Sequence, residues 1–225
     1  MRWDAIPVFV PLIFEGVKIT LQISALGVLF GTLIGLLVGL VRSQKTRNLA
    51  QRALYGLATL YVEAVRGTPF LVQLYLMYYV PYFLLAIDLP ALTAGIIAIS
   101  LNSGAYVAEI FRGAIQSVDR GQMEAGRSLG LTFAQTMRHI ILPQAFRRAL
   151  PPLANEFASL IKESSVVSVL GVADIMFKAK TVGAAHFAVV PALVVAAVYY
   201  FLLTGITSQL VRLLERRLGK SDSHS

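Results

Sequence analysis

The chain has 225 residues, of which 56% are hydrophobic and 14% are charged, and this composition excludes an ordinary soluble domain. Its formal net charge of +8 would suit nucleic-acid binding, but basic residues also collect in the cytoplasmic loops of membrane proteins, and the hydrophobic content favours that explanation. Cysteine is absent, which excludes disulfides and thiolate metal sites, and the three histidines are too scattered for a metal cluster.

Long runs without charge predict an all-α membrane protein with five transmembrane helices in a single domain, residues 1–225. The predicted spans lie at about residues 8–41, 53–87, 89–111, 150–173 and 186–211. No removable signal peptide is expected, because no small-residue cleavage site follows the first apolar run. The first span is therefore expected to direct insertion into the bilayer itself.

The first span carries a stripe of glycines. Gly27, Gly31, Gly35 and Gly39 are each four residues apart, which places all four on one face of a helix. Small residues at this spacing allow the backbone of a neighbouring helix to approach closely. The stripe predicts a packing surface and carries no chemistry of its own.

Polar residues interrupt the next two spans. In the second, Gly67-Thr68-Pro69 includes a proline that removes a backbone donor in the middle of the span, and Gln73 follows. In the third, Asn102, Tyr106 and Glu109 share a helix face through spacings of four and three residues, with Ser103 beside them. A polar stripe on an apolar span indicates the lining of a pathway, and hydrogen bonding between helices is the alternative.

The fourth span holds Lys162 and Glu163 near its middle. A charge at the bilayer centre costs about 2.5–3.5 kcal/mol on insertion scales, so such residues usually face a cavity or a partner. Two interpretations remain open. Lys162 and Glu163 bind a carboxylate and an ammonium group of a solute, or they form ion pairs with Glu63, Arg66 or Glu109 that hold the spans together.

The distribution of basic residues predicts the topology. Residues 42–56, 112–148 and 212–225 contain 14 Lys and Arg, whereas residues 1–15, 82–91 and 171–187 contain only Arg2, Lys178 and Lys180. Positive residues favour the cytoplasmic side. The N-terminus is therefore expected outside and the C-terminus inside, with the long loop at about residues 112–149 facing the cytoplasm.

That loop is expected to fold into two helices. One is predicted over Gln122–Leu129 and ends at Gly130, and a second, at about Thr132–Ile141, is predicted to stop before Pro143. Two short helices around a glycine form a compact knob that suits a groove on a partner protein. An amphipathic helix pair lying on the membrane surface is the alternative.

The same loop carries a recognisable motif. It reads Glu124-Ala125-Gly126, three residues, Gly130, nine residues, then Ile140-x-Leu142-Pro143. This resembles the EAA loop, which contains the coupling helix, in permease subunits of bacterial ATP-binding-cassette (ABC) importers; Gly126 departs from the pattern, which has alanine there. Similarity to the polar amino acid uptake subfamily is carried by Glu63 with Arg66-Gly67-Thr68-Pro69 and Gln73, by residues 102–110 with Arg112-Gly113, and by Leu150-Pro151-Pro152, Asn155 and residues 162–165.

The resemblance implies the transmembrane subunit of an ATP-driven importer that moves a polar amino acid by alternating access, and Glu109 and Glu163 favour a basic one. The implied ATPase-coupling residues, within 120–143, are Glu124, Ala125, Gly126, Arg127, Gly130, Leu131 and Pro143. The expected substrate pathway is lined by Thr68, Gln73, Asn102, Ser103, Tyr106, Glu109, Lys162 and Glu163. Which amino acid is carried stays open.

The resemblance also implies partners. They are two ABC ATPase subunits that use ATP and Mg²⁺, a second permease that is identical or paralogous, and an extracytoplasmic amino-acid-binding protein. The chain itself is expected to be no enzyme, to bind no cofactor, metal or nucleic acid, and to lie in the bacterial inner membrane. An alternative is a secondary transporter driven by an ion gradient, with Glu109, Lys162 and Glu163 as relay groups. A membrane-embedded enzyme would need a cluster of nucleophile and base, which the sequence does not display.

Overall fold

The computed structural model describes residues 3–43 and 48–222, with the side chains of residues 212 and 214–222 left undescribed. Arg2, Lys45, Arg47 and the basic side chains of the C-terminal tail therefore lie outside the described residues. All regular secondary structure in the described part of the chain is helical, which confirms the predicted all-α class. In order, the elements are η1 Trp3–Ala5, α1 Ile6–Ser43, α2 Leu49–Arg66, α3 Phe70–Leu85, α4 Ala91–Gln116, α5 Arg120–Ser128, α6 Phe133–Thr136, the π-helical turn η2 Met137–Ile141, α7 Leu142–Glu163, η3 Ser164–Leu170, α8 Ile175–Ala185 and α9 Val189–Asp222.

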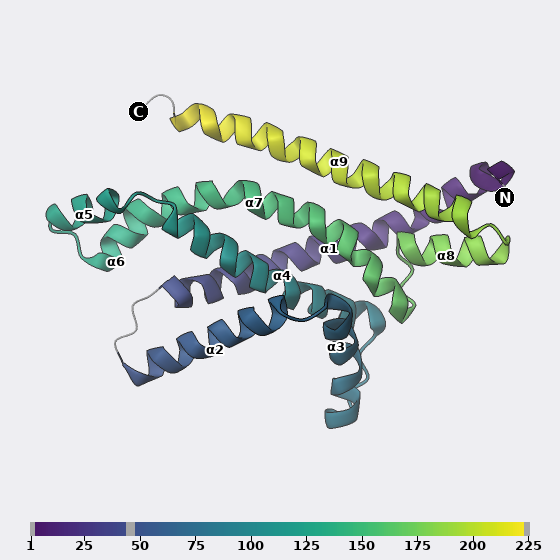
Figure 1. The fold of residues 1–225 in the computed structure, drawn as a ribbon, viewed down its shortest axis with the longest axis horizontal. Coiled ribbons are helices and arrows are strands. Elements are labelled where there is room, and N and C mark those ends of the chain that lie inside the picture. The colour runs from purple at the N-terminus through teal and green to yellow at the C-terminus, as the bar shows by residue number, and fades with distance from the viewer. Residues whose placement is uncertain (1–2, 44–47, 223–225) are drawn as a thin grey trace.

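The long helices form an elongated bundle (Figure 1). Helices α1, α4, α7 and α9 run along its length, and α4 packs against both α1 and α7. The N-terminus and α8 lie at one end of the bundle, whereas α5, α6 and the end of α9 lie at the other. The predicted coupling segment thus occupies the end opposite the N-terminus.

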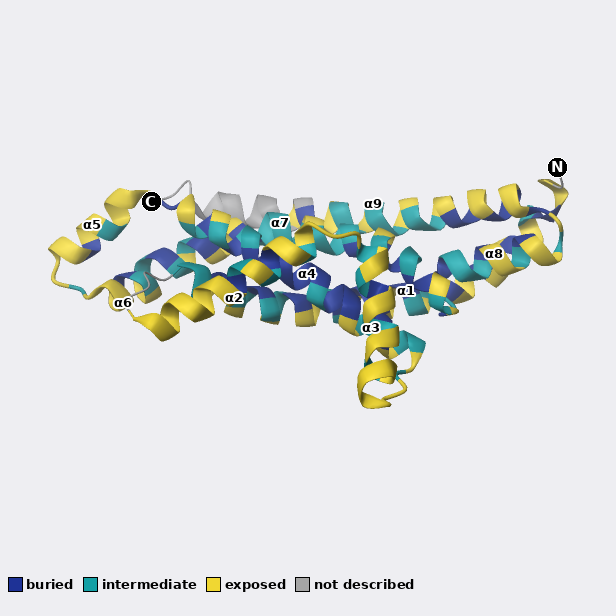
Figure 2. Cartoon of the chain, turned by 60° about the horizontal axis from the view of Figure 1, so that its bottom comes forward, coloured by how far each residue is buried: buried dark blue, intermediate teal, exposed yellow. Residues whose placement is uncertain are grey.

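Three helices are long and apolar enough to cross a membrane: Trp3–Ser43, Ala91–Gln116 and Val189–Val211. Helices α2 and α3 are long and apolar enough to cross a membrane if they are taken together, but the chain bends by 112° between them. The predicted second span is therefore a bent pair, broken where Gly67-Thr68-Pro69 ends α2. Figure 2 shows α3 projecting from the bundle with mostly exposed side chains. A five-span count stays a prediction, because α7 is not among these apolar helices.

The glycine stripe packs α1 against α4, as predicted. A Cβ atom added at Gly27 would lie 2.8 Å from Ile99 Cγ2, and one added at Gly35 would lie 2.5 Å from Val107 Cβ. At Gly31 the added atom would lie 2.7 Å from Ser103 Cβ, whereas at Gly39 the contact is looser, 3.3 Å from Phe111 Cβ. The α4 partners are also four residues apart, so the two helices interlock turn by turn. No larger side chain fits along this seam without separating the helices.

The predicted end of a helix before Pro143 is wrong. Helices α6, η2 and α7 follow one another without a break, and Pro143 lies in the first turn of α7. Inside a helical rod a proline removes a backbone hydrogen bond and crowds the preceding turn, and here the π-helical turn η2 directly precedes it. Helix α7 also continues through Pro151-Pro152 to Glu163. One nearly continuous rod therefore joins the coupling segment to the predicted fourth span.

The segment expected as a loop after residue 173 is the helix α8. Asp174 begins it, because its wholly buried carboxylate accepts a hydrogen bond of 2.8 Å from the Phe177 backbone N–H. The Tyr200 hydroxyl on α9 donates to the other carboxylate oxygen over 3.4 Å. Asp174 lies in the turn before α8, outside the candidate spans, and burial raises its pKa to about 6.

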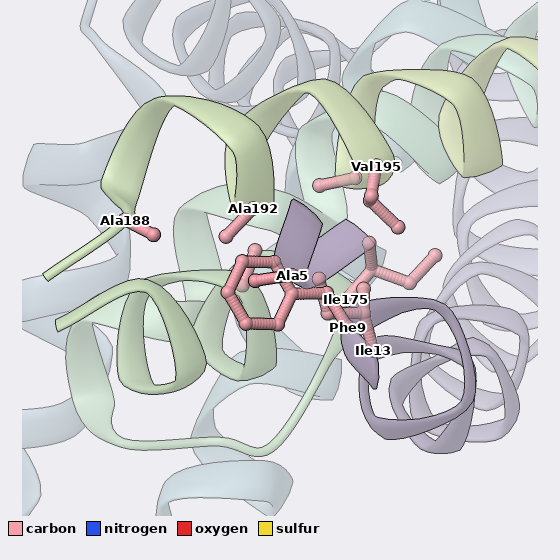
Figure 3. Packing of buried hydrophobic residues seen from close by; sticks show 9 residues of the cluster. Ala5, Phe9, Ile13, Ile175, Ala188, Ala192 and Val195 are labelled. Atoms are coloured by element: carbon pink, nitrogen blue, oxygen red, sulfur yellow. The ribbon is translucent and has the colours of Figure 1, made fainter. Parts of the chain in front are cut away.

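Hydrophobic packing joins the N-terminal end of the bundle. Phe9 and Ile13 of α1 are fully buried against Ile175 of α8 and Ala192 of α9 (Figure 3). Large apolar side chains elsewhere face outward, such as Leu37 at 67% exposure. An apolar exterior around a packed interior is what a bilayer requires.

Candidate functional site

The predicted coupling segment folds as a helical knob. Asp119 begins α5, since its carboxylate accepts from the Gly121 backbone N–H at 2.7 Å. Helix α5 ends just before Gly130, which has φ of +84°, and the Leu131 N–H donates to the Gly126 carbonyl oxygen over 3.2 Å. A left-handed residue after the last turn is the common helix stop that glycine permits. The prediction of a helix near 122–129 broken by Gly130 is confirmed.

Helices α5 and α6 touch at Gly126. A Cβ atom at this position would lie 2.5 Å from Thr136 Cγ2 and 3.1 Å from Ile140 Cδ1. Thr132 and Gln135 form a capping box that orients α6 for this contact. The departure of this chain from the family motif therefore matches the space available, because an alanine here would push α5 away from α6.

The remaining predicted coupling residues are distributed over the surface of the knob. Glu124, Ala125, Arg127 and Gly130 are exposed, and Leu131 is half-buried. The Arg127 guanidinium donates to the Leu131 carbonyl oxygen at 2.8 Å, which ties the two helices together across the turn. Pro143 is also exposed, but it lies further along, on α7. Leu129, 82% exposed at the tip, offers an apolar contact that has no counterpart within the described chain.

Three of the predicted pathway residues meet at the bend between α2 and α3. The Gln73 amide nitrogen donates to the carbonyl oxygens of Val65, at 2.7 Å, and Thr68, at 3.0 Å. The Asn102 amide of α4 donates to the Gln73 side-chain oxygen over 2.9 Å. Carbonyls released by the helix break are thus satisfied by Gln73, which in turn is held by α4. The bend is a polar site to which α2, α3 and α4 each contribute.

Ser103 points away from that bend. It is fully buried beneath Gly31 of α1, and its side chain faces Glu156 of α7. Sequence reasoning missed Glu156. It lies seven residues before Glu163, which is two helical turns on the same face of α7. That spacing of two acids in a predicted span was the signal that would have found it.

Glu109 is the centre of an ion-pair network. Its carboxylate pairs with Arg42 of α1 through one oxygen, and with Arg112 at 2.6 Å and Arg66 at 3.8 Å through the other. The Arg66 guanidinium also lies 5.7 Å from the centre of the Tyr106 ring. The network joins α1, α2 and α4, so Glu109 has a packing role in addition to its place on the predicted polar face.

Lys162 and Glu163 take no part in that network. Lys162 is exposed and Glu163 is half-buried. In the part of the chain that the structure describes, no ion pair joins either residue to Glu63, Arg66 or Glu109. The packing interpretation of this pair therefore finds no partner within the described chain.

Comparison with known proteins places the chain in a family. The family model described as "Binding-protein-dependent transport system inner membrane component" matches residues 27–220. The chain belongs to this family. The match extends from the glycine stripe through the coupling segment to α9, so it includes every element that carries a candidate residue. The predicted location in the inner membrane follows from the family.

Characterised relatives agree with this assignment. The chain is 39% identical over 217 residues to the glutamine transport system permease protein GlnP of Escherichia coli (strain K12), covering 96% of this chain and 97% of that protein. It is 38% identical over 221 residues to the L-cystine transport system permease protein TcyB of Bacillus subtilis (strain 168), covering 97% and 92%. These relatives are permease subunits, and they give no support to the ion-gradient-driven alternative.

Solved structures show the same architecture. The chain matches an amino acid ABC transporter, crystallised with histidines, with a TM-score of 0.89 and 40% identity, covering 96% of this chain and 99% of that chain. The inward-facing MetNI methionine ABC transporter matches with a TM-score of 0.71, at 22% identity and with 90% and 96% covered. The second likeness shows the fold alone.

Proposed function

We propose that this chain is the permease subunit of an ATP-driven amino acid importer, coupled to a separate ATPase through residues 120–143. Family membership and the names of the relatives support the transport role. Two ATPase subunits, a second permease and an extracytoplasmic binding protein complete the assembly. The predicted topology puts the knob in the cytoplasm and the N-terminus outside, which brings the knob to the compartment where ATP is hydrolysed.

The continuity of α6, η2 and α7 carries the coupling proposal. Helix α5 is held to α6 at Gly126, and α6 continues through η2 into α7 without a break. A displacement imposed on α5 by the ATPase is therefore passed along one rod. That rod carries Glu156, Lys162 and Glu163 in its second half. Movement of the knob is thereby coupled to movement of the polar residues of α7.

The polar residues of α7 and of the α2–α3 bend form the proposed solute pathway. Gln73 and Asn102 offer amide groups at the bend, while Lys162 offers a cation suited to a carboxylate. In the part of α7 that follows Pro152, Glu156 and Glu163 outnumber the single base Lys162, which favours a basic amino acid. Lys162 is exposed near the end of α7, so we propose that a second permease covers this charge.

The proposal is tested first by co-purification. An ABC ATPase encoded with this chain should stay bound to it in detergent, and uptake into proteoliposomes should require ATP inside. Uptake that persists without ATP and stops with an ionophore would refute the ATP-driven mechanism in favour of an ion gradient.

Gly130→Pro tests the coupling route. Proline holds φ near about −65°, whereas Gly130 has φ of +84°, so the turn between α5 and α6 cannot form in this variant. We expect normal membrane insertion but ATP hydrolysis that no longer depends on solute. Gly130→Asn is the matched control, because asparagine tolerates the left-handed conformation. Solute-stimulated hydrolysis equal to wild type in Gly130→Pro would contradict the proposed route.

A further inference from the structure

A groove opens between the bundle and the coupling segment. It has a volume of about 830 Å³ and lies between α1, α4, α5 and the α6–η2 turn. Arg127 and Arg138 line its outer part, together with Ser43 at the end of α1. Leu40, on α1, lies on its inner wall with Ile115 and Leu142.

A smaller apolar cavity continues this groove into the bundle. It has a volume of about 210 Å³ and shares Leu40, Ile115 and Leu142 with the first. Its other walls include Phe111 and Phe146, whose rings stack with centres 6.2 Å apart. Because three lining residues are common to both spaces, the two are neighbours, and we refer to them together as the channel.

The channel changes from apolar to basic in the direction of the coupling segment. Leu36 and Leu40 are one turn apart on α1, and Ser43 follows at the end of the helix. These residues belong to candidate membrane spans, while Arg127 and Arg138 lie beyond the span ends. An acyl chain followed by a charged headgroup has the same order of polarity.

The two arginines present unneutralised positive charge to the groove. Among the residues that the structure describes, no carboxylate forms an ion pair with Arg127 or Arg138. Arg127 gives one hydrogen bond to the Leu131 carbonyl oxygen, and a guanidinium has five donors. Arginine binds phosphate through two parallel hydrogen bonds, and basic pockets between membrane helices bind the headgroups of anionic lipids.

We infer that this channel binds an anionic phospholipid, with its phosphate on Arg127 and Arg138 and an acyl chain along Leu40, Ile115 and Leu142. The apolar inner part excludes a free inorganic anion as the natural occupant, since such an ion would leave that part unfilled. Arg138 lies on η2 and Arg127 on α5, whereas the inner walls belong to α1, α4 and α7. A lipid seated here bridges the coupling segment to the bundle.

Native mass spectrometry of the purified complex, with its ATPase and second permease present, measures this binding. Phosphatidylglycerol and phosphatidylcholine with identical acyl chains are titrated in parallel. Two arginines near a surface favour the anionic lipid by more than about tenfold, and Arg138→Gln should remove about fivefold of that preference. Arg120→Gln is the matched control, because Arg120 is exposed on α5 but does not line the groove.

A second pair of variants tests the apolar part. Leu40→Trp fills the channel from a half-exposed position and should lower the binding of both lipids, whereas Leu37→Trp, on the outer face of α1, should leave binding unchanged. Inorganic phosphate should displace little of the bound phosphatidylglycerol. Equal binding of the two lipids by wild type, equal effects of Arg138→Gln and Arg120→Gln, or complete displacement by inorganic phosphate would each overturn the inference.

Discussion

Replacing Gly35 by alanine tests whether the α1–α4 seam holds this protein together. The added Cβ atom would lie 2.5 Å from both Cβ and Cγ1 of Val107 and 2.8 Å from the Gly104 carbonyl oxygen. Carbon atoms in good contact are about 3.5–4.0 Å apart, so the overlap is about 1 Å. All three crowding atoms resist displacement, because the Gly104 carbonyl belongs to the backbone and Val107 is branched at Cβ.

The helices must therefore separate locally. A gap of about 0.5–1 Å forfeits a quarter to a half of each dispersion contact on either side of it. Overpacking of this kind typically costs about 1–3 kcal/mol. For a chain of this size the cost corresponds to a melting temperature lowered by roughly 3–10 °C. Gly113→Ala is the control, because nothing lies within 4 Å of its added Cβ atom.

Thermal unfolding of both variants in the same detergent, followed by intrinsic fluorescence, measures the difference. Gly113→Ala should melt at or above the wild-type temperature, since alanine favours a helix over glycine by about 1 kcal/mol. Gly35→Ala should melt below the wild-type temperature, and the ATPase subunit should dissociate from it during purification. A Gly35→Ala protein as stable as Gly113→Ala would refute the conclusion that close backbone approach stabilises the seam.

Three further predictions concern charged residues. Glu109→Gln should lower the free energy of unfolding by about 3 kcal/mol, because it leaves the nearly buried Arg42 without its carboxylate partner. The control Glu15→Gln removes an exposed ion pair and should lower it by less than about 1 kcal/mol. Equal melting temperatures of the two variants would contradict this prediction. Lys162→Ala should reduce solute uptake with the ATPase still bound, and unchanged uptake would exclude it as a solute ligand. The pKa of Asp174 is raised to about 6 in the folded protein, so the folded state holds this proton more tightly than the unfolded state does. The stabilisation that this gives is present at low pH and is lost as the pH rises to about 6. The free energy of unfolding of the wild type should therefore fall by about 1 kcal/mol between pH 5 and 7. Asp174→Asn, which keeps the helix cap, should show a smaller loss over the same range, and an identical pH profile would contradict the assignment.

Local patterns in the sequence predicted local structure well. The four-residue spacing of glycines predicted close packing, and the structure supplies the partner helix, which the pattern alone does not specify. Gly130 was predicted to end a helix, and its positive φ confirms the prediction. Both succeed because glycine acts through its own backbone, whatever lies elsewhere in the chain.

Features that depend on distant contacts were missed. Pro143 was expected to stop a helix, but a π-helical turn before it lets the helix continue. The three arginines around Glu109 come from three different helices, and no sequence spacing relates Arg42 to Glu109. Glu156 was overlooked because its neighbour Ser103 lies on another element. Tertiary packing decides each of these.

The matched spacing of glycines on α1 and their partners on α4 has a consequence for the transport cycle. Because side chains of α4 lie against glycines four residues apart on α1, we expect a slide of α1 by less than a helical turn to bring its larger side chains against α4. We therefore expect α1 and α4 to keep their positions relative to each other during transport. The proposed alternating access is then expected to come from elements outside this pair, at the α2–α3 bend and along the rod from α5 to α7.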